Sequence, residues 1–193
     1  MTREGAHAAV APGRRARSTG SLVIVLAIAA GASVGNLYLL QPLLPAVARA
    51  FATTPRTVGL VSMLTQVGYG AVMFFFVPLG DVLPRRRLML ALLAMVTVAL
   101  LATATASRLP LLGAAALVVG LTTVVPQLAV PLAADLAAPE MRGRAVGTVM
   151  GALLAGILLA RTVSGFVGAH LGWRAVASLP YPALLRSLFT LAR

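Results

Sequence analysis

The chain has 193 residues, of which 60% are hydrophobic and only 10% are charged. An average soluble domain carries charge on about 25% of its residues, because its surface faces water. The composition excludes a soluble enzyme, a disordered tail and a secreted disulfide scaffold, and it predicts a polytopic helical membrane protein. Since one membrane helix takes about 20 residues, the length allows roughly six spans with short loops.

The formal net charge is +12, and every basic residue is an arginine. These arginines lie between the apolar runs, which is typical of membrane topology signals and not of a nucleic-acid-binding face. We therefore expect no nucleic-acid partner. The chain has no cysteine, and its two histidines, His7 and His170, have no other metal ligands near them in sequence. No metal or cofactor is expected.

A polar arm over residues 1–20 precedes the first apolar run. This run begins at Leu22 and continues to about Val47, which is too long for a signal peptide, so we expect a retained membrane helix. Its polar side chains can hydrogen-bond either a ligand or a neighbouring helix, and both interpretations stay open. They are Asn36, Tyr38 and Gln41, followed by Pro42 and Pro45.

The second and third apolar runs, residues 58–80 and 88–106, are joined by a short charged connector. Gln66 in the second run offers the same choice between a ligand and a helix contact. The connector is either a simple topology signal or a latch of charges that holds neighbouring helices in one conformational state. The residues of this candidate latch are Gly80, Asp81, Arg85 and Arg86.

In the fourth run, residues 111–136, Gln127 lies between Pro126 and Pro131. Kinks at these prolines free backbone carbonyls, so Gln127 is a further candidate for contact with a substrate or a helix. The connector after this run, residues 137–144, contributes three more residues to the candidate latch. These are Glu140, Arg142 and Arg144.

The fifth run, residues 145–171, contains Arg161 about two thirds of the way across. A charge inside the bilayer costs about 2.5–3.5 kcal/mol on insertion scales, so it normally faces water or a partner. That partner is an anionic substrate, a backbone carbonyl or water; alternatively, the side chain extends to the outer interface. Glycines that permit close helix packing mark the same run, namely Gly147, Gly151, Gly156 and Gly165.

The last segment, residues 175–193, is a weak sixth span because Pro180, Pro182 and Arg186 interrupt its apolar stretch. We therefore predict five clear spans within residues 21–174, followed by an incomplete or aberrant sixth helix. Nine arginines flank the spans on the N-terminal side and four on the other, which predicts a cytoplasmic N-terminus.

The sequence has no nucleophile elbow, P-loop, HExxH motif or carboxylate cluster. We therefore expect no enzymatic activity, and no ATP-driven transport by this chain alone.

Several stretches resemble the N-terminal half of major facilitator superfamily transporters, in particular bacterial efflux members, over about residues 20–175. They are NLYLLQPLLP (36–45), PLGDVLPRRR (78–87), PEMRGRAVG (139–147), ARTVSG (160–165) and GWR (172–174). The first is similar to the first-helix signature, the second to the signature loop between helices two and three, and the third to its counterpart between helices four and five. The last two are together similar to the end of helix five and the loop that follows it.

The chain departs from the family pattern at several positions. Val82 and Pro84 replace a basic residue and a glycine that are common in the signature loop. Ala116 stands where the fourth helix often has an arginine, and Ala160 with Arg161 replaces a Gly-Pro pair of the antiporter pattern. The membrane arginine is therefore on the fifth helix and not on the fourth.

The resemblance implies an all-α bundle that is the N-terminal six-helix half of this fold. It implies a uniporter or, as we favour, a proton-coupled exporter of small molecules in the bacterial inner membrane. In such proteins two halves rock around a midplane site. The expected partners are lipid, a small-molecule substrate, protons, and either a missing C-terminal half or a second copy. We expect a frameshift or a premature stop to explain the sequence after Arg174.

Three interpretations stay open: a transporter polypeptide, a functional half that dimerises or pairs with a separate half, and an inactive membrane fragment. Drugs, sugars and small anions fit the sequence equally well as substrates. Substrate binding or translocation is predicted for Asn36, Tyr38, Gln41, Gln66, Gln127 and Arg161.

Overall fold

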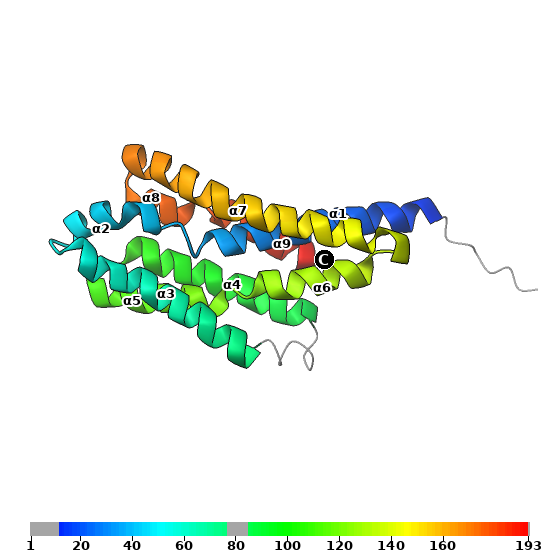
Figure 1. Ribbon diagram of the computed structural model, residues 1–193, viewed down its shortest axis with the longest axis horizontal. Coiled ribbons are helices and arrows are strands. Elements are labelled where there is room, and N and C mark those ends of the chain that lie inside the picture. The colour runs from blue at the N-terminus through cyan, green and yellow to red at the C-terminus, as the bar shows by residue number, and fades with distance from the viewer. Residues whose placement is uncertain (1–11, 77–84, 193) are drawn as a thin grey trace, which may run out of the picture.

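The computed structural model describes residues 12–76 and 85–192, and within these ranges every regular element is a helix (Figure 1). In chain order the elements are α1 (Pro12–Gly35), η1 (Gln41–Leu43), α2 (Leu44–Ala50), α3 (Pro55–Phe76), α4 (Arg85–Thr105), α5 (Leu109–Thr122), α6 (Val125–Leu136), η3 (Pro139–Met141), α7 (Arg142–Leu171), α8 (Trp173–Ser178) and α9 (Tyr181–Ala192).

Four helical segments of the described chain are long and apolar enough to cross a membrane: Pro55–Phe74, Arg87–Thr105, Leu109–Leu136 and Pro139–Leu171. Gly20–Gly35 is a shorter apolar helix at the first predicted span. In lipid such segments are helical because the backbone has to satisfy its own hydrogen bonds.

The first apolar run does not form one helix, so the prediction of a single helix from Leu22 to about Val47 is wrong. Helix α1 ends at Gly35, a turn occupies residues 36–40, and η1 and α2 continue the segment. Pro42 and Pro45 explain the interruption, because each lacks an N–H donor and its ring clashes with the carbonyl four residues earlier.

The fourth run is also divided. Helix α5 ends at Thr122, and α6 begins at Val125 with Pro126 in its first turn. The ring of Pro126 is incompatible with a helical carbonyl at Thr122, which explains the predicted kink. Next to the break, the buried hydroxyl of Thr123 donates to the Val119 carbonyl at 2.6 Å, so this side chain satisfies its own donor.

The helices are arranged in two close parallel pairs, α1 with α7 and α3 with α5 (Figure 1). A Cβ atom added at Gly31 would lie 2.6 Å from the Ala152 carbonyl oxygen, and one added at Gly156 would meet the backbone of Gly31. In the second pair, Cβ atoms at Gly68 and Gly120 would likewise meet backbone atoms of the partner helix. Glycine is required because these backbones touch.

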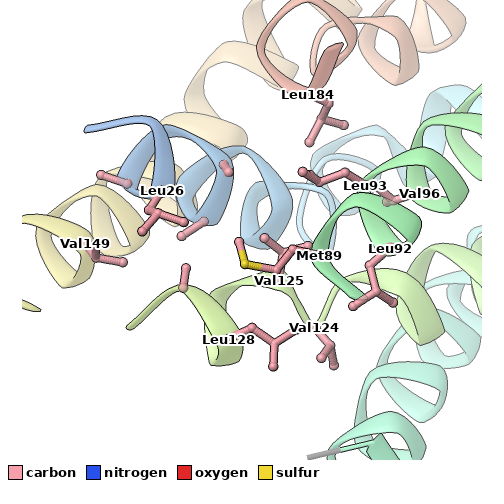
Figure 2. Close-up of a cluster of buried hydrophobic side chains, with 14 of the residues drawn as sticks. Leu26, Met89, Leu92, Leu93, Val96, Val124, Val125, Leu128, Val149 and Leu184 are labelled. Carbon is pink, nitrogen blue, oxygen red and sulfur yellow. The ribbon is translucent and has the colours of Figure 1, made fainter. Parts of the chain in front are cut away.

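The main hydrophobic core lies where α1, α4, α6 and α7 converge (Figure 2). Leu26, Met89, Val125 and Val149 are fully buried there, one from each of these helices. Leu184 of α9 is also fully buried in this core. The predicted weak sixth segment thus folds as α8 and α9, and α9 packs against α1 and α4.

The turn between α7 and α8 is fixed by Gly172, whose φ of +83° is accessible to glycine and costly for other residues. It positions Trp173 with its ring centroid 5.8 Å from that of Phe51. Arg174 stacks on Trp173 at 4.4 Å and donates a hydrogen bond to the Ala106 carbonyl at 3.0 Å. This contact satisfies a carbonyl at the end of α4.

Gly156→Ala is expected to destabilise the chain by about 1–3 kcal/mol, because the new methyl meets the rigid backbone of α1. Gly151→Ala is the matched control on the same helix, with no described atom within 4 Å of an added Cβ. It should be neutral or stabilise by up to about 1 kcal/mol through helix propensity. Thermal unfolding in detergent, followed by circular dichroism, measures both. Equal effects would contradict the observed packing of α1 on α7.

Candidate functional site

Three of the predicted substrate residues come together around the membrane arginine. The Nη2 atom of Arg161 donates a hydrogen bond to Oε1 of Gln41 at 3.1 Å. The guanidinium carbon of Arg161 also lies 5.3 Å from the ring centroid of Tyr38, within the range of a cation–π contact. We name Tyr38, Gln41 and Arg161 the arginine cluster.

The interruption after α1 positions this cluster. Tyr38 lies in the turn and Gln41 begins η1, so neither side chain follows the helical register of α1. Because α1 and α7 run in the same direction, the end of α1 lies level with the C-terminal half of α7, where Gly35 approaches Ala160. The turn therefore brings two polar side chains to the depth of Arg161.

Arg161 is exposed within the described chain, and most of its donors remain available. A guanidinium has five N–H donors in a planar fork, and the structure uses one of them on Gln41. The described carboxylates do not neutralise it, since Asp135 lies near the end of α6 and Glu140 precedes the first turn of α7. The cluster thus presents a positive charge with open hydrogen-bonding positions.

A second polar contact joins α3 and α6. The Nε2 atom of Gln127 donates to the Tyr69 hydroxyl at 3.1 Å, across the two helices. Gln66 lies exposed about one turn before Tyr69 on α3, and Gln127 is exposed next to the break between α5 and α6. These residues form a separate polar patch, for which no contact with the arginine cluster is observed among the described side chains.

Asn36 is placed differently from the other five predicted substrate residues. Its side chain is only 5% exposed, and neither atom of its amide group makes a hydrogen bond in the described structure. The residue lies between an apolar cleft of about 450 Å³, bounded by α1, α7 and α9, and a much smaller internal cavity. Its predicted role in substrate binding stays a prediction.

The candidate latch is only partly described. Gly80 and Asp81 lie outside the described residues, and Arg85 and Arg86 begin α4 with side chains that are also outside the description. The other three residues, Glu140, Arg142 and Arg144, are exposed around the start of α7, and no ion pair joins them in the described structure. The latch stays a prediction.

The four glycines predicted for helix packing fall into two groups. Gly156 touches the backbone of α1 closely, whereas Gly147, Gly151 and Gly165 have no described atom within 4 Å of an added Cβ. Packing at these three positions would need a neighbour other than the described helices.

The internal cavity and the contact of Arg174 with the end of α4 were not predicted from the sequence. Ser62, Thr65 and Thr103 each look like an ordinary hydroxyl in an apolar run, and only the fold brings them to one place. Neighbouring residues of a helix do not face each other, so the sequence did not predict the contacts of Arg174 with Trp173 and the Ala106 carbonyl.

Long apolar helices, broken membrane segments and a buried apolar core define a polytopic helical membrane protein. The family model described as "Major Facilitator Superfamily" matches residues 26–191. The chain therefore belongs to this family, and the predicted family and helical bundle fold are confirmed.

Curated relatives are also named as transporters. The chain is 42% identical over 156 residues to "Uncharacterized transporter YgaY" of Escherichia coli O157:H7, which covers 81% of this chain and 40% of that protein. It is 41% identical over 152 residues to "Probable transporter SCO4007" of Streptomyces coelicolor, covering 79% and 35%. The chain thus matches about two fifths or less of the length of these relatives.

Cysteines introduced at the exposed polar positions should reveal whether they face water. The native chain has no cysteine, so each variant carries one thiol. In liposomes, Gln66→Cys, Gln127→Cys and Arg161→Cys should react with N-ethylmaleimide at least about tenfold faster than Val98→Cys, because the reactive thiolate forms in water. Val98 is the control, being 65% exposed on the apolar helix α4. Equal rates at all four positions would show that the polar residues face lipid.

Proposed function

We propose that this chain forms the N-terminal part of a pathway that carries a small molecule across the membrane, and that the arginine cluster binds an acidic group of that molecule. The observation that carries the proposal is the exposed Arg161, which is held by Gln41 and Tyr38 and has open donors. An arginine fork matches a carboxylate or phosphate in two parallel hydrogen bonds.

The cost of a membrane charge supports this choice of substrate. An arginine within an apolar helix costs about 2.5–3.5 kcal/mol on insertion scales, and neutral Gln41 and Tyr38 offset only part of that cost. An anion supplies the missing countercharge during binding. A neutral sugar or a cationic drug does not, so we favour acids among the substrate classes that the sequence leaves open.

The site would be completed by a second helical body. In this family's architecture substrates bind near the bilayer midplane between two repeats. Only 11% of the most apolar stretch of Pro139–Leu171 is buried, so this helix has a large surface for such a neighbour. That neighbour is a C-terminal half or, as a second candidate, another copy of this chain. An inactive fragment is the outcome if neither assembles.

Direction, coupling and orientation complete the proposal. The similarity of residues 36–45 and 160–165 to efflux members supports export, and the proton is our proposed coupling ion. The arginine count at the helix ends supports a cytoplasmic N-terminus in the bacterial inner membrane.

Accumulation assays in cells that express the chain test the proposal with four radiolabelled or fluorescent probes: benzoate, glucose 6-phosphate, lactose and ethidium. We expect lower accumulation of an acidic probe with the parent chain, and loss of this effect in Arg161→Gln. Loss of a charge-assisted hydrogen bond costs about 1.5–3 kcal/mol, which corresponds to roughly 10–100-fold weaker binding. Arg161→Lys should restore part of the effect, because it keeps the charge but not the fork.

Thr162→Ala is the matched control, since Thr162 is the exposed neighbour of Arg161 and its hydroxyl bonds the Leu158 carbonyl of its own helix. It should behave like the parent chain. Suppose that the parent chain lowers the accumulation of lactose or ethidium, and that Arg161→Gln does not change the accumulation of either acid. The transport proposal then stands, and the proposed acidic substrate is wrong. If no probe responds to the parent chain, the transport proposal itself fails for this polypeptide.

A further inference from the structure

A small internal cavity of about 20 Å³ lies beside the turn that interrupts the first membrane segment. Residues of this turn, of α3, α4 and α5, and of α8 line it, so it sits at a junction of distant parts of the chain. Most of its lining is apolar. Its polar side chains are Asn36, Ser62, Thr65 and Thr103.

Two of these side chains have no hydrogen-bond partner in the described structure. Asn36 is 95% buried, and both its Oδ1 and Nδ2 atoms are unpaired; the Oγ atom of Ser62 is unpaired as well. A buried polar group without a partner is costly, more so in an apolar interior, and native structures rarely leave one. The unpaired Nδ2 of Asn36 is a donor and its unpaired Oδ1 is an acceptor, and the Ser62 hydroxyl can do either. These groups indicate a ligand that both donates and accepts hydrogen bonds.

The two threonines are ready to complete such a site. Thr65 donates to the Val61 carbonyl at 3.2 Å, and Thr103 donates to the Ala99 carbonyl at 2.9 Å. Their hydroxyl protons are therefore engaged, but each oxygen can still accept a hydrogen bond.

We propose that this cavity binds one water molecule, which donates to Asn36 Oδ1 and the Thr103 hydroxyl oxygen and accepts from Ser62. A buried water needs about 10–15 Å³ of this kind of space and two to four polar partners, and the cavity offers both. Water can donate to Asn36 Oδ1 and accept from Ser62, which a cation cannot do. No described charged residue lines the cavity, so the charge of a cation bound there would lack a countercharge.

The water gives Asn36 a positioning role. It ties the start of the turn to α3 and α4, and the same turn carries Tyr38 and leads to Gln41. This inference is independent of what the arginine cluster binds, because it rests on the cavity and the unpaired atoms alone.

Selective labelling allows a direct test, because Asn36 is the only asparagine in the chain. In full-length protein labelled with side-chain ¹⁵N-asparagine and held in detergent micelles, one NH₂ group gives the signal. We expect a nuclear Overhauser cross-peak between water and this group, with the sign of a long-lived bound water. Absence of the cross-peak overturns the proposal.

Three further spectra separate water from other sources. A cross-peak that is relayed through the exchanging hydroxyl of Ser62 disappears in Ser62→Ala. A cross-peak from bound water survives in this variant. Loss of the cross-peak in Ser62→Ala therefore overturns the proposal. Thr103→Val removes one water partner and should weaken the cross-peak. Thr97→Val should not, since Thr97 lies on the same helix with the same bond to a carbonyl four residues earlier, but not at the cavity.

Stability supplies a second measurement. If water satisfies Asn36, then Asn36→Leu leaves Ser62 without a partner, and the folded-to-unfolded ratio should fall at least about tenfold. If the amide is simply unsatisfied, the same substitution raises the ratio and overturns the proposal. A rise in melting temperature with sodium chloride but not with choline chloride would assign the cavity to a cation and overturn it as well.

Discussion

The interruption of the first membrane segment is the constraint on which the described site depends. Two prolines forbid a continuous helix through residues 36–45, yet an apolar environment does not tolerate unpaired backbone groups. The turn solves part of this conflict locally, because the amides of Asn36, Leu37 and Tyr38 donate to carbonyls three residues earlier at 3.1, 3.2 and 2.9 Å. The segment then continues as η1 and α2, and the side chains of the turn leave the face they would occupy on a helix.

Contact between helix backbones sets the depth at which those side chains arrive. Gly31 lies against Ala152 and Gly35 against Ala160, so α1 and α7 are held close and in a fixed register. A shift by one turn would move the end of α1 by about 5.4 Å along α7. Gln41 would then no longer reach Arg161. Small residues at the contact of α1 with α7 therefore determine the geometry of the cluster.

The sequence was sufficient for the fold class and the family, because both depend on features that are local in the chain. Apolar runs, prolines and short motifs are visible without a structure, and Arg161 is recognisable as a charge in an apolar run. Its contacts with Tyr38 and Gln41 were not predictable, because they depend on which helices pack side by side. The same holds for Gly156, which looks like Gly151 in sequence but packs against another backbone.

Arg161 also bears on how this surface is completed. It lies on the least buried of the four candidate spans, beside Leu158, which is 69% exposed. Apolar side chains there are compatible with lipid, but a guanidinium with open donors is not. One hydrogen bond and one aromatic contact orient the charge without neutralising it. Helix α7 carries both exposed apolar side chains and a guanidinium with open donors. Its environment matches both when the surface around Arg161 faces a polar space and the remaining surface contacts lipid or another helix. In the proposed function, the turn orients the arginine cluster and a second helical body would close its open side.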